Sequence, residues 1–497
     1  MGYRYASAQT TKKRSDTGIL LLFLIDRIFP GPELKHLREA LGFKEFFMVK
    51  KVKSAEGTPD GFVVDTTIST LGSAKIPSPL SYTHFTEGLT PFFLDDEYID
   101  ELRGRDPVPT WFEPAGPREH LYFDSSKTKC AIVTCGGLCP GINDVIRAIV
   151  MEAYHNYKVP AVLGIKYGLE GFIPKYGHEI VELTPHTVAD IHQFGGTMLG
   201  SSRGPQSPEE IVDALERMNI NVLFVIGGDG SMKATNCIVR EVTKRNLRIA
   251  IIGIPKTIDN DINFISQSFG FETAVFKATE AIQCAHVEAL GARNGIGIVK
   301  LMGRESGFIA AQATMALKEV NFVLIPEVPF TLLGREGLLP ALELRLRKRR
   351  HAVIVAAEGA GQDLLHVSGQ HDASGNPVLG DIGVFLRDEI KAYLNERKMD
   401  HSIKFIDPSY IIRSVPANAN DRVYCGFLGQ NAVHAAMAGK TGMVVAKLMD
   451  RYVHLPIDLV TRKRQKVNPH SAFWRSTLES TGQMDFVGGE PDRSQAD

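Results

Sequence analysis

Short apolar runs that end in glycine-rich or polar loops recur from about residue 127 to residue 420. Their β-branched residues and abrupt ends are typical of buried strands in a parallel sheet. Strands are expected within residues 128–137, 159–168, 220–230, 246–255, 294–304, 321–327 and 351–359. Residues 142–155 and 208–219 instead have helical spacing, and Ser207 with acidic residues after it predicts a helix start. This alternation predicts an α/β fold with two doubly wound sheets.

The first 120 residues lack such periodicity and are rich in proline and loop signals, so we expect an N-terminal extension. Within it, the apolar run at residues 18–25 follows three basic residues, as in a secretory signal. The run is too short to span a bilayer and ends at Asp26, which favours an extension or a short buried element. A secretory signal and an organelle transit peptide stay open as alternatives.

Composition is that of an ordinary globular protein. A formal net charge of −1 gives no reason to expect nucleic acid as a partner, and no membrane association is expected. Six cysteines are too few for a disulfide scaffold and lack the paired spacing of a zinc site. A reducing compartment, the cytoplasm, is therefore expected.

Ligands of open α/β sheets bind beyond the carboxyl ends of the strands. After the first strand, Gly136, Gly137 and Gly141 let backbone N–H groups approach an anion at a helix start, although a tight packing turn would also need them. In "GGDGS", Asp229 stands among glycines, which favours a carboxylate that holds Mg²⁺ beside phosphate over a helix cap. Arg203, in a Gly/Ser/Pro loop, is either a ligand of a transferring phosphoryl group or a solvated side chain.

The segment "PKTIDND" at residues 255–261 ends another strand with unusually dense loop chemistry. Phosphoryl transfer to an alcohol needs a carboxylate that accepts the hydroxyl proton, and Asp259 and Asp261 supply one for that role and one near the metal. An Asx-turn with solvated carboxylates is the alternative. Further strand ends carry residues suited to a sugar phosphate. They are Gly303, Arg304, Glu358, Tyr410 and Arg413.

These loops, in this order, resemble the phosphofructokinase family over roughly residues 115–480. The phrases "VTCGGLCPGIND", "GGTMLGSSRGPQ", "GIPKTIDNDI", "VKLMGRESGFIA" and "YIIRSVPANAND" look most like the long ATP-dependent branch of plants and trypanosomatids. The resemblance implies two Rossmann-like domains with the active site in the cleft between them, and a homo-oligomer, usually a tetramer. It divides the chain into an extension (1–120), a nucleotide-binding domain (121–270, completed by part of 420–470), a fructose-6-phosphate domain (271–419) and a C-terminal extension with a polar tail (471–497).

The resemblance also implies roles for single residues in ATP-dependent phosphorylation of fructose 6-phosphate, a step of glycolysis. Asp259 would deprotonate the 1-hydroxyl, with Arg203 and Gly137 as further catalytic residues, and Asp229 would serve Mg²⁺. ATP would contact Gly137, Arg203, Gly204, Gly228, Asp229, Gly230 and Ser231. The sugar phosphate would contact Thr257, Ile258, Asp259, Met302, Gly303, Arg304, Glu358, Tyr410 and Arg413. Effector sites cannot be mapped onto this chain, and Gly295 stands about where bacterial relatives carry an arginine.

The resemblance implies that two positions help to select the phosphoryl donor. Gly230 would leave room for a nucleotide, where pyrophosphate-dependent relatives carry an aspartate whose charge would repel it. Lys256 matches the pyrophosphate type, but it attracts phosphate of either kind. We therefore expect ATP, with a pyrophosphate-dependent enzyme as the alternative. A lipid or NAD kinase would lack the sugar-phosphate set, and an inactive regulatory subunit would be expected to lose Asp229 or Asp259.

Overall fold

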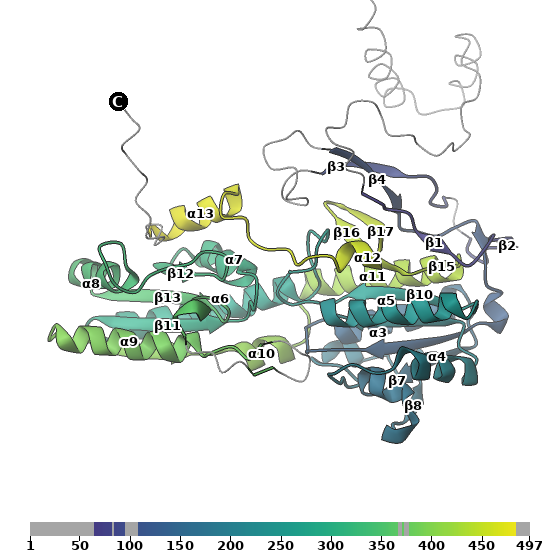
Figure 1. Cartoon of the computed structure of the whole chain (residues 1–497), viewed down its shortest axis with the longest axis horizontal. Helices are drawn as coiled ribbons and strands as arrows, with labels where there is room; N and C mark the ends of the chain where they lie inside the picture. The colour runs from purple at the N-terminus through teal and green to yellow at the C-terminus, as the bar shows by residue number, and fades with distance from the viewer. Residues whose placement is uncertain (1–63, 82–83, 95–107, 366–369, 372–376, 484–497) are drawn as a thin grey trace, which may run out of the picture. The chain divides into compact units, whose positions relative to one another are not determined.

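The computed structural model describes residues 64–81, 84–94, 108–365, 370–371 and 377–483. Residues 18–25, with their apolar run, lie outside this part of the chain. Two sheets dominate the described residues, one of nine strands and one of four (Figure 1). Two short ribbons add β1 (Ser69–Thr70) with β15 (Lys440–Thr441), and β2 (Ile76–Pro77) with β5 (His120–Leu121).

The nine-stranded sheet has the order β3-β4-β17-β16-β10-β9-β6-β7-β8, and its five central strands, from β16 to β7, run parallel. Its strands are β3 (Thr90–Leu94), β4 (Val108–Pro114), β6 (Lys129–Thr134), β7 (Ala161–Ile165), β8 (Ile180–Glu182), β9 (Val222–Gly227), β10 (Ala250–Pro255), β16 (Met443–Leu448) and β17 (Arg451–Pro456). Every residue of β9 and β10 is buried, as expected for strands covered on both faces.

Helices cover both faces of this sheet. Phe224 and Ile252 join a core with α3 (Ile142–Met151) and α11 (Ala419–Met437), so even-numbered residues of β9 and β10 face these helices. Gly253 faces α5 (Asp229–Lys244), because a Cβ there would lie 2.7 Å from the Met232 sulfur. The helix predicted after Ser207 is α4 (Pro208–Arg217), which packs on α5, and the Ser207 hydroxyl accepts a hydrogen bond from the Glu210 N–H.

The four-stranded sheet repeats this plan with all its strands parallel, in the order β12-β13-β11-β14. Its strands are β11 (Gly295–Leu301), β12 (Phe322–Leu324), β13 (His351–Ala357) and β14 (Ser402–Ile406). Val299 and Val355 pack with α6 (Phe271–Leu290) and α7 (Phe308–Leu317), whereas Ile298 and Ile354 pack with α8 (Leu338–Arg349) and α9 (Ile382–Glu396). The two predicted doubly wound sheets are therefore confirmed, and so are all seven expected strands.

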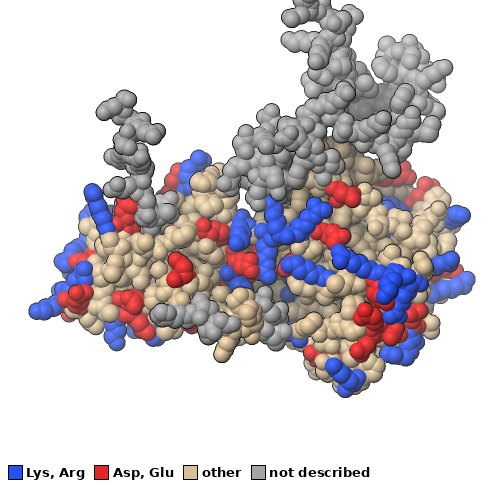
Figure 2. Space-filling model, viewed as in Figure 1, with Lys and Arg blue, Asp and Glu red and all other residues tan. Residues whose placement is uncertain are grey.

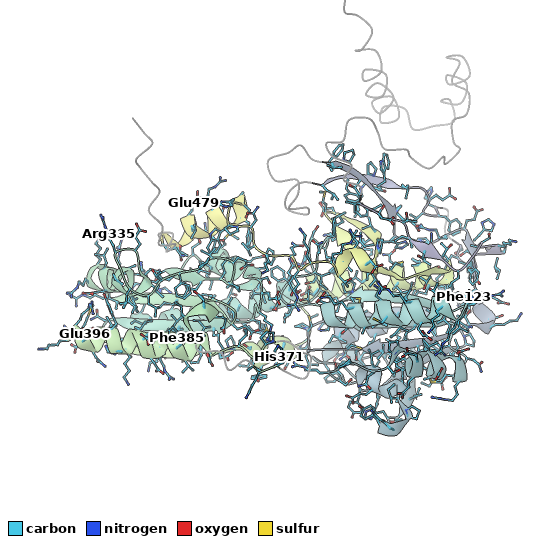
Figure 3. The ribbon with its side chains drawn as sticks, viewed as in Figure 1. Phe123, Arg335, His371, Phe385, Glu396 and Glu479 are labelled. Atoms are coloured by element: carbon cyan, nitrogen blue, oxygen red, sulfur yellow. The ribbon has the colours of Figure 1, made fainter. Side chains whose placement is uncertain are left out.

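Both ends of the described chain add structure beyond this plan. Residues 108–114, expected to belong to an extension, form β4, which pairs with β17 and buries Thr110 and Phe112 on alternate positions. At the other end, α12 (Ile457–Val460) is followed by a crossing segment and α13 (Ala472–Thr481) (Figure 1). Trp474 of α13 is buried in the core around α7, and Glu479 of the same helix is labelled in Figure 3.

A buried carboxylate joins α11 to α6. Asp421 accepts hydrogen bonds from the N–H groups of Gly270 and Thr273 at 2.9 and 2.8 Å, and one from the Thr273 hydroxyl at 2.5 Å. It therefore caps α6 from a helix that is remote in sequence. Because α11 packs on the nine-stranded sheet and α6 on the four-stranded sheet, this cap connects the two cores.

Replacing Asp421 with alanine should lower the free energy of unfolding by about 2–4 kcal/mol, since two buried N–H donors lose their acceptor. Urea unfolding of the full-length chain, followed by circular dichroism, measures this change. The exposed neighbour Asn420, whose amide donates a surface hydrogen bond to Glu272 of α6 at 2.8 Å, is the control, and its alanine variant should unfold within about 1 kcal/mol of the parent chain. Equal stability of the two variants would show that the cap contributes little.

Candidate active site

Strand pairing brings three predicted loops to one edge of the nine-stranded sheet. β9 pairs in parallel with both β6 and β10, and the three strands end at Gly227, Thr134 and Pro255. The pairing continues past the strands, because the Cys135 N–H donates to Ile226 and the Lys256 N–H donates to Gly227. The glycine loop, the start of α5 and the "PKTIDND" loop are therefore neighbours.

Lys256 lies at the centre of the first group of predicted residues. Its buried Nζ donates a hydrogen bond to the Gly137 carbonyl at 2.7 Å. A Cβ on Gly136 would lie 3.8 Å from this Nζ and 3.7 Å from the Ser231 hydroxyl, and a Cβ on Gly137 would lie 3.9 Å from Nη2 of Arg203. Burial lowers the pKa of Lys256, while nearby Asp259 and Asp261 oppose that shift. Cationic side chains, a hydroxyl and bare backbone thus converge as a phosphate site requires.

Glycine is needed at some positions of this group and not at others. Gly204, directly after Arg203, has a left-handed φ of 102°, and a Cβ on Gly228 would lie 3.1 Å from the Lys256 carbonyl oxygen. At Gly230 a Cβ would meet nothing within 4 Å. Packing therefore does not explain the glycine at position 230, where a side chain would project into open space.

The "PKTIDND" loop is held by its own side chains. Asn260 has a left-handed φ of 56°, and its side-chain oxygen accepts from the Ser268 N–H at 2.8 Å. The Thr257 hydroxyl donates to Oδ1 of Asp261 at 2.6 Å and accepts from the Asp259 N–H at 3.3 Å. Asp261 is only 7% exposed, so an Asx-turn with solvated carboxylates does not describe this loop.

Asp259 connects this loop to the end of β11. Its Oδ2 accepts a long hydrogen bond from the Arg304 N–H at 3.4 Å, and its carbonyl accepts from the Ser306 hydroxyl at 2.9 Å. Its Oδ1 is buried and has no hydrogen-bond partner among the described residues. Burial, followed by the charges of Asp261 and Glu358, raises the pKa of Asp259. A buried carboxylate that has a raised pKa, and one oxygen without a hydrogen-bond partner, is suited to accept a proton.

The second group of predicted residues follows β11, β13 and β14. Gly303 has a φ of 124°, and a Cβ there would lie 2.3 Å from the Ser306 carbonyl oxygen, so only glycine fits. Its carbonyl accepts from the Gly359 N–H at 3.1 Å, which holds Glu358 beside the loop after β11. Burial raises the pKa of Glu358, and Arg304, Lys300 and Arg413 lower it from nearby.

Tyr410 and Arg413 come from α10 (Ser409–Ser414), where the guanidinium of Arg413 lies 4.5 Å from the centre of the Tyr410 ring. Tyr410 is 72% exposed, so this pair stands at the solvent-facing side of the group. Met302 is buried in the core of the four-stranded sheet, and partly buried Ile258 packs against the cores of both sheets. These two apolar residues position the loops that contain them.

Two cations of this region were absent from the sequence prediction. Lys300, at the carboxyl end of β11, forms ion pairs of 2.9 Å with Asp381 and Asp407. Arg464, in the segment between α12 and α13, faces Asp229, Asp261 and Glu305 at 3.6, 3.6 and 2.9 Å. A strand-end position is a usable signal for Lys300, whereas Arg464 stands in an unpatterned basic stretch.

Two carboxylates from different strand ends, those of Asp229 and Asp261, lie near the same cation. Both carboxylates lie within 3.6 Å of Arg464, and Asp229 also pairs with Lys233 at 2.9 Å. Among the described residues, no cluster of three or more histidine, cysteine or acidic side chains is arranged to hold a metal. One or two carboxylates are nevertheless what Mg²⁺ uses when phosphate oxygens and water complete its coordination.

Lysine and arginine side chains are interspersed with acidic ones over the face seen in Figure 2. This mixture agrees with the near-zero net charge. No helix of the described part of the chain has the length and apolar character needed to cross a membrane.

Comparison with known proteins gives consistent matches. The ATP-dependent 6-phosphofructokinase of Borreliella burgdorferi is 49% identical over 84% of this chain and 97% of its own length. A chloroplastic ATP-dependent 6-phosphofructokinase of Arabidopsis thaliana is 49% identical over 76% of this chain and 70% of its own. The Trypanosoma brucei brucei enzyme of the same name is 43% identical over 84% and 87% of the two chains.

Among solved structures, a pyrophosphate-dependent phosphofructokinase from Marinobacter aquaeolei matches 72% of this chain and 92% of its own, with a TM-score of 0.59. At 21% identity this likeness supports the fold alone. The sequence profile named phosphofructokinase matches residues 129–436, which include both strand-end groups up to Arg413. With a family match over more than half of its length, the chain belongs to the phosphofructokinase family.

Proposed function

We propose that this chain is an ATP-dependent 6-phosphofructokinase, which transfers the γ-phosphoryl group of ATP to the 1-hydroxyl of fructose 6-phosphate. The products are fructose 1,6-bisphosphate and ADP. Relatives that bear this name are 43–49% identical over most of the chain. The observation that carries the proposal is the position of Asp259. It lies between the residues around Lys256 and the loop of Arg304, and its buried Oδ1 has no hydrogen-bond partner among the described residues.

In this proposal Asp259 is the general base. Oδ1 accepts the proton of the 1-hydroxyl, and its raised pKa matches a group that must take up that proton in the transition state. The N–H of Arg304 and the hydroxyl of Ser306 fix the loop of Asp259, so the base keeps its orientation toward the acceptor.

The remaining side chains bind and orient. Arg304 and Arg413 recognise the 6-phosphate, and Glu358 accepts hydrogen bonds from sugar hydroxyls. Lys256 and Arg203, with the glycine loop, hold the phosphates of the donor. Asp229, with Asp261, would hold Mg²⁺, which when bound neutralises developing charge on the phosphates.

ATP is favoured as donor because of Gly230. A side chain at this position would project into open space, so the glycine leaves room for a nucleotide phosphate rather than serving the packing of α5. Pyrophosphate use, the alternative, is supported by Lys256, yet that lysine is tied to the glycine loop and serves either donor. A tetramer and a cytoplasmic location stay predictions from the sequence.

Replacing Asp259 with asparagine should lower kcat by about 10²–10⁴-fold while KM for fructose 6-phosphate changes little, because the amide keeps the shape but accepts no proton. Steady-state kinetics with saturating ATP and Mg²⁺ measures both constants. The Asp400→Asn variant, at an exposed carboxylate paired with Arg293, is the matched control. Turnover of the Asp259 variant within tenfold of the parent enzyme would rule out Asp259 as the base.

The pH profile should reveal the raised pKa of Asp259. The base acts when deprotonated, so kcat/KM for fructose 6-phosphate should fall as pH drops through that pKa. Because burial, Asp261 and Glu358 all raise it, the acidic limb should lie above the ordinary carboxyl value of about 4. A limb at or below that value would mean that the base is a solvated group.

Substitutions at Gly230 test whether this position selects ATP as the phosphoryl donor. The Gly230→Asp variant should lose at least about 100-fold in kcat/KM for ATP, because a carboxylate placed near the nucleotide phosphates repels them. Gly230→Ala is the control for size, since its Cβ meets no protein atom within 4 Å, and it should lose much less than Gly230→Asp because it adds one methyl group and no charge. Equal losses in both variants would assign the effect to space rather than charge.

A further inference from the structure

The segment of residues 461–468, called here the C-terminal strap, runs alongside the loop of the proposed base. It leaves α12 and leads to α13, and is the yellow trace between these helices in Figure 1. Arg464 forms an antiparallel bridge with Ile262, and the Gln465 N–H donates to the Asp261 carbonyl at 2.8 Å. The Val467 N–H donates to Glu327 at 2.7 Å. The strap is thus fixed by its backbone at Arg464 and over the next three residues.

Arg464 meets three carboxylates that follow three different strands. Its Nη1 lies 2.9 Å from Glu305 and 3.6 Å from Asp261, and its Nε lies 3.6 Å from Asp229. The side chain is 22% exposed, so water screens these charges only in part. The close contact with Glu305 anchors the guanidinium, whereas the two longer distances exceed hydrogen-bond length.

These distances suggest that Arg464 can move away from the aspartates without losing its charge partner. Glu305 is 44% exposed and retains the guanidinium near the rim of the site. Asp229 and Asp261 are the carboxylates proposed above to hold Mg²⁺. A monovalent cation held loosely against both of them opposes any second cation that approaches the same oxygens.

We infer that Arg464 is an internal counter-ion that competes with Mg²⁺ for Asp229 and Asp261, and that Glu305 retains it when the metal binds. The inference rests on the proposed function, which assigns Asp229 to the metal. Arg464 is a positioning residue in this scheme and sets the metal affinity of the site. It lies beyond residues 129–436, the part of the chain that matches the family profile.

Direct metal binding tests this inference without turnover. Mn²⁺, which shares the oxygen preference of Mg²⁺, is titrated into the full-length protein at about pH 8, and free Mn²⁺ is followed by electron paramagnetic resonance. Arg464→Gln should bind Mn²⁺ about tenfold more tightly than the parent protein, because the guanidinium that faces both aspartates is gone, while Lys233 still pairs with Asp229. Glu305→Gln should bind it several-fold more weakly, because Arg464 then has no second partner.

Lys466→Gln is the matched control for charge. This exposed residue of the strap loses the same unit of charge without facing either aspartate, so its Mn²⁺ affinity should equal that of the parent protein. An unchanged or weaker affinity in Arg464→Gln would overturn the inference, and so would an equal gain in Lys466→Gln. The Glu305 variant supplies an effect of opposite sign should the arginine variant fail to fold.

Asp229→Asn separates this inference from the proposed metal site. If it abolishes Mn²⁺ binding while Arg464→Gln changes nothing, the metal assignment stands and the competition is refuted. If it leaves Mn²⁺ binding intact, the proposed metal site is wrong, and the inference fails with it.

Discussion

The parallel pairing of β9 with β6 and β10 is the constraint on which the rest of the site depends. Parallel strands place their carboxyl ends at one edge, and here the backbone pairing extends to Cys135 and Lys256. Both strand faces must then be covered, which requires the apolar composition of β9 and β10 and the helices on either side. The polar loops that follow these strands therefore meet at that edge of the sheet.

Charge balance is the second constraint. Burial raises the pKa of both Asp259 and Asp261; the charge of Asp261 adds to the shift of Asp259, and the charge of Asp229 adds to that of Asp261. Positive charge near these carboxylates comes from Lys256, which is bound to the Gly137 carbonyl, and from Arg464 of the strap. A site that must bind a polyanionic donor and a metal benefits from carboxylates whose counter-ions are fixed by backbone contacts.

Much of this arrangement could be predicted from the sequence, because short β-branched runs and their terminal glycines are local signals. The positions of Lys256, Asp259 and Gly303 follow from the ends of the strands that carry them. The pairing of β4 with β17 could not be predicted, since Pro109 and Pro114 are unusual in a strand that pairs on both sides and since β17 is remote in sequence. Arg464 could not be predicted for a similar reason: its place depends on the backbone contacts of the strap with Ile262, Asp261 and Glu327, which are remote in sequence.

The most direct measurement of the central proposal is turnover by the purified full-length protein with fructose 6-phosphate and Mg²⁺, given ATP in one reaction and pyrophosphate in another. The proposal predicts fructose 1,6-bisphosphate with ATP and none with pyrophosphate. Product with pyrophosphate alone would mean that Lys256 outweighs Gly230 in the choice of donor. No product with either donor would contradict the proposed phosphofructokinase activity and favour an inactive regulatory subunit.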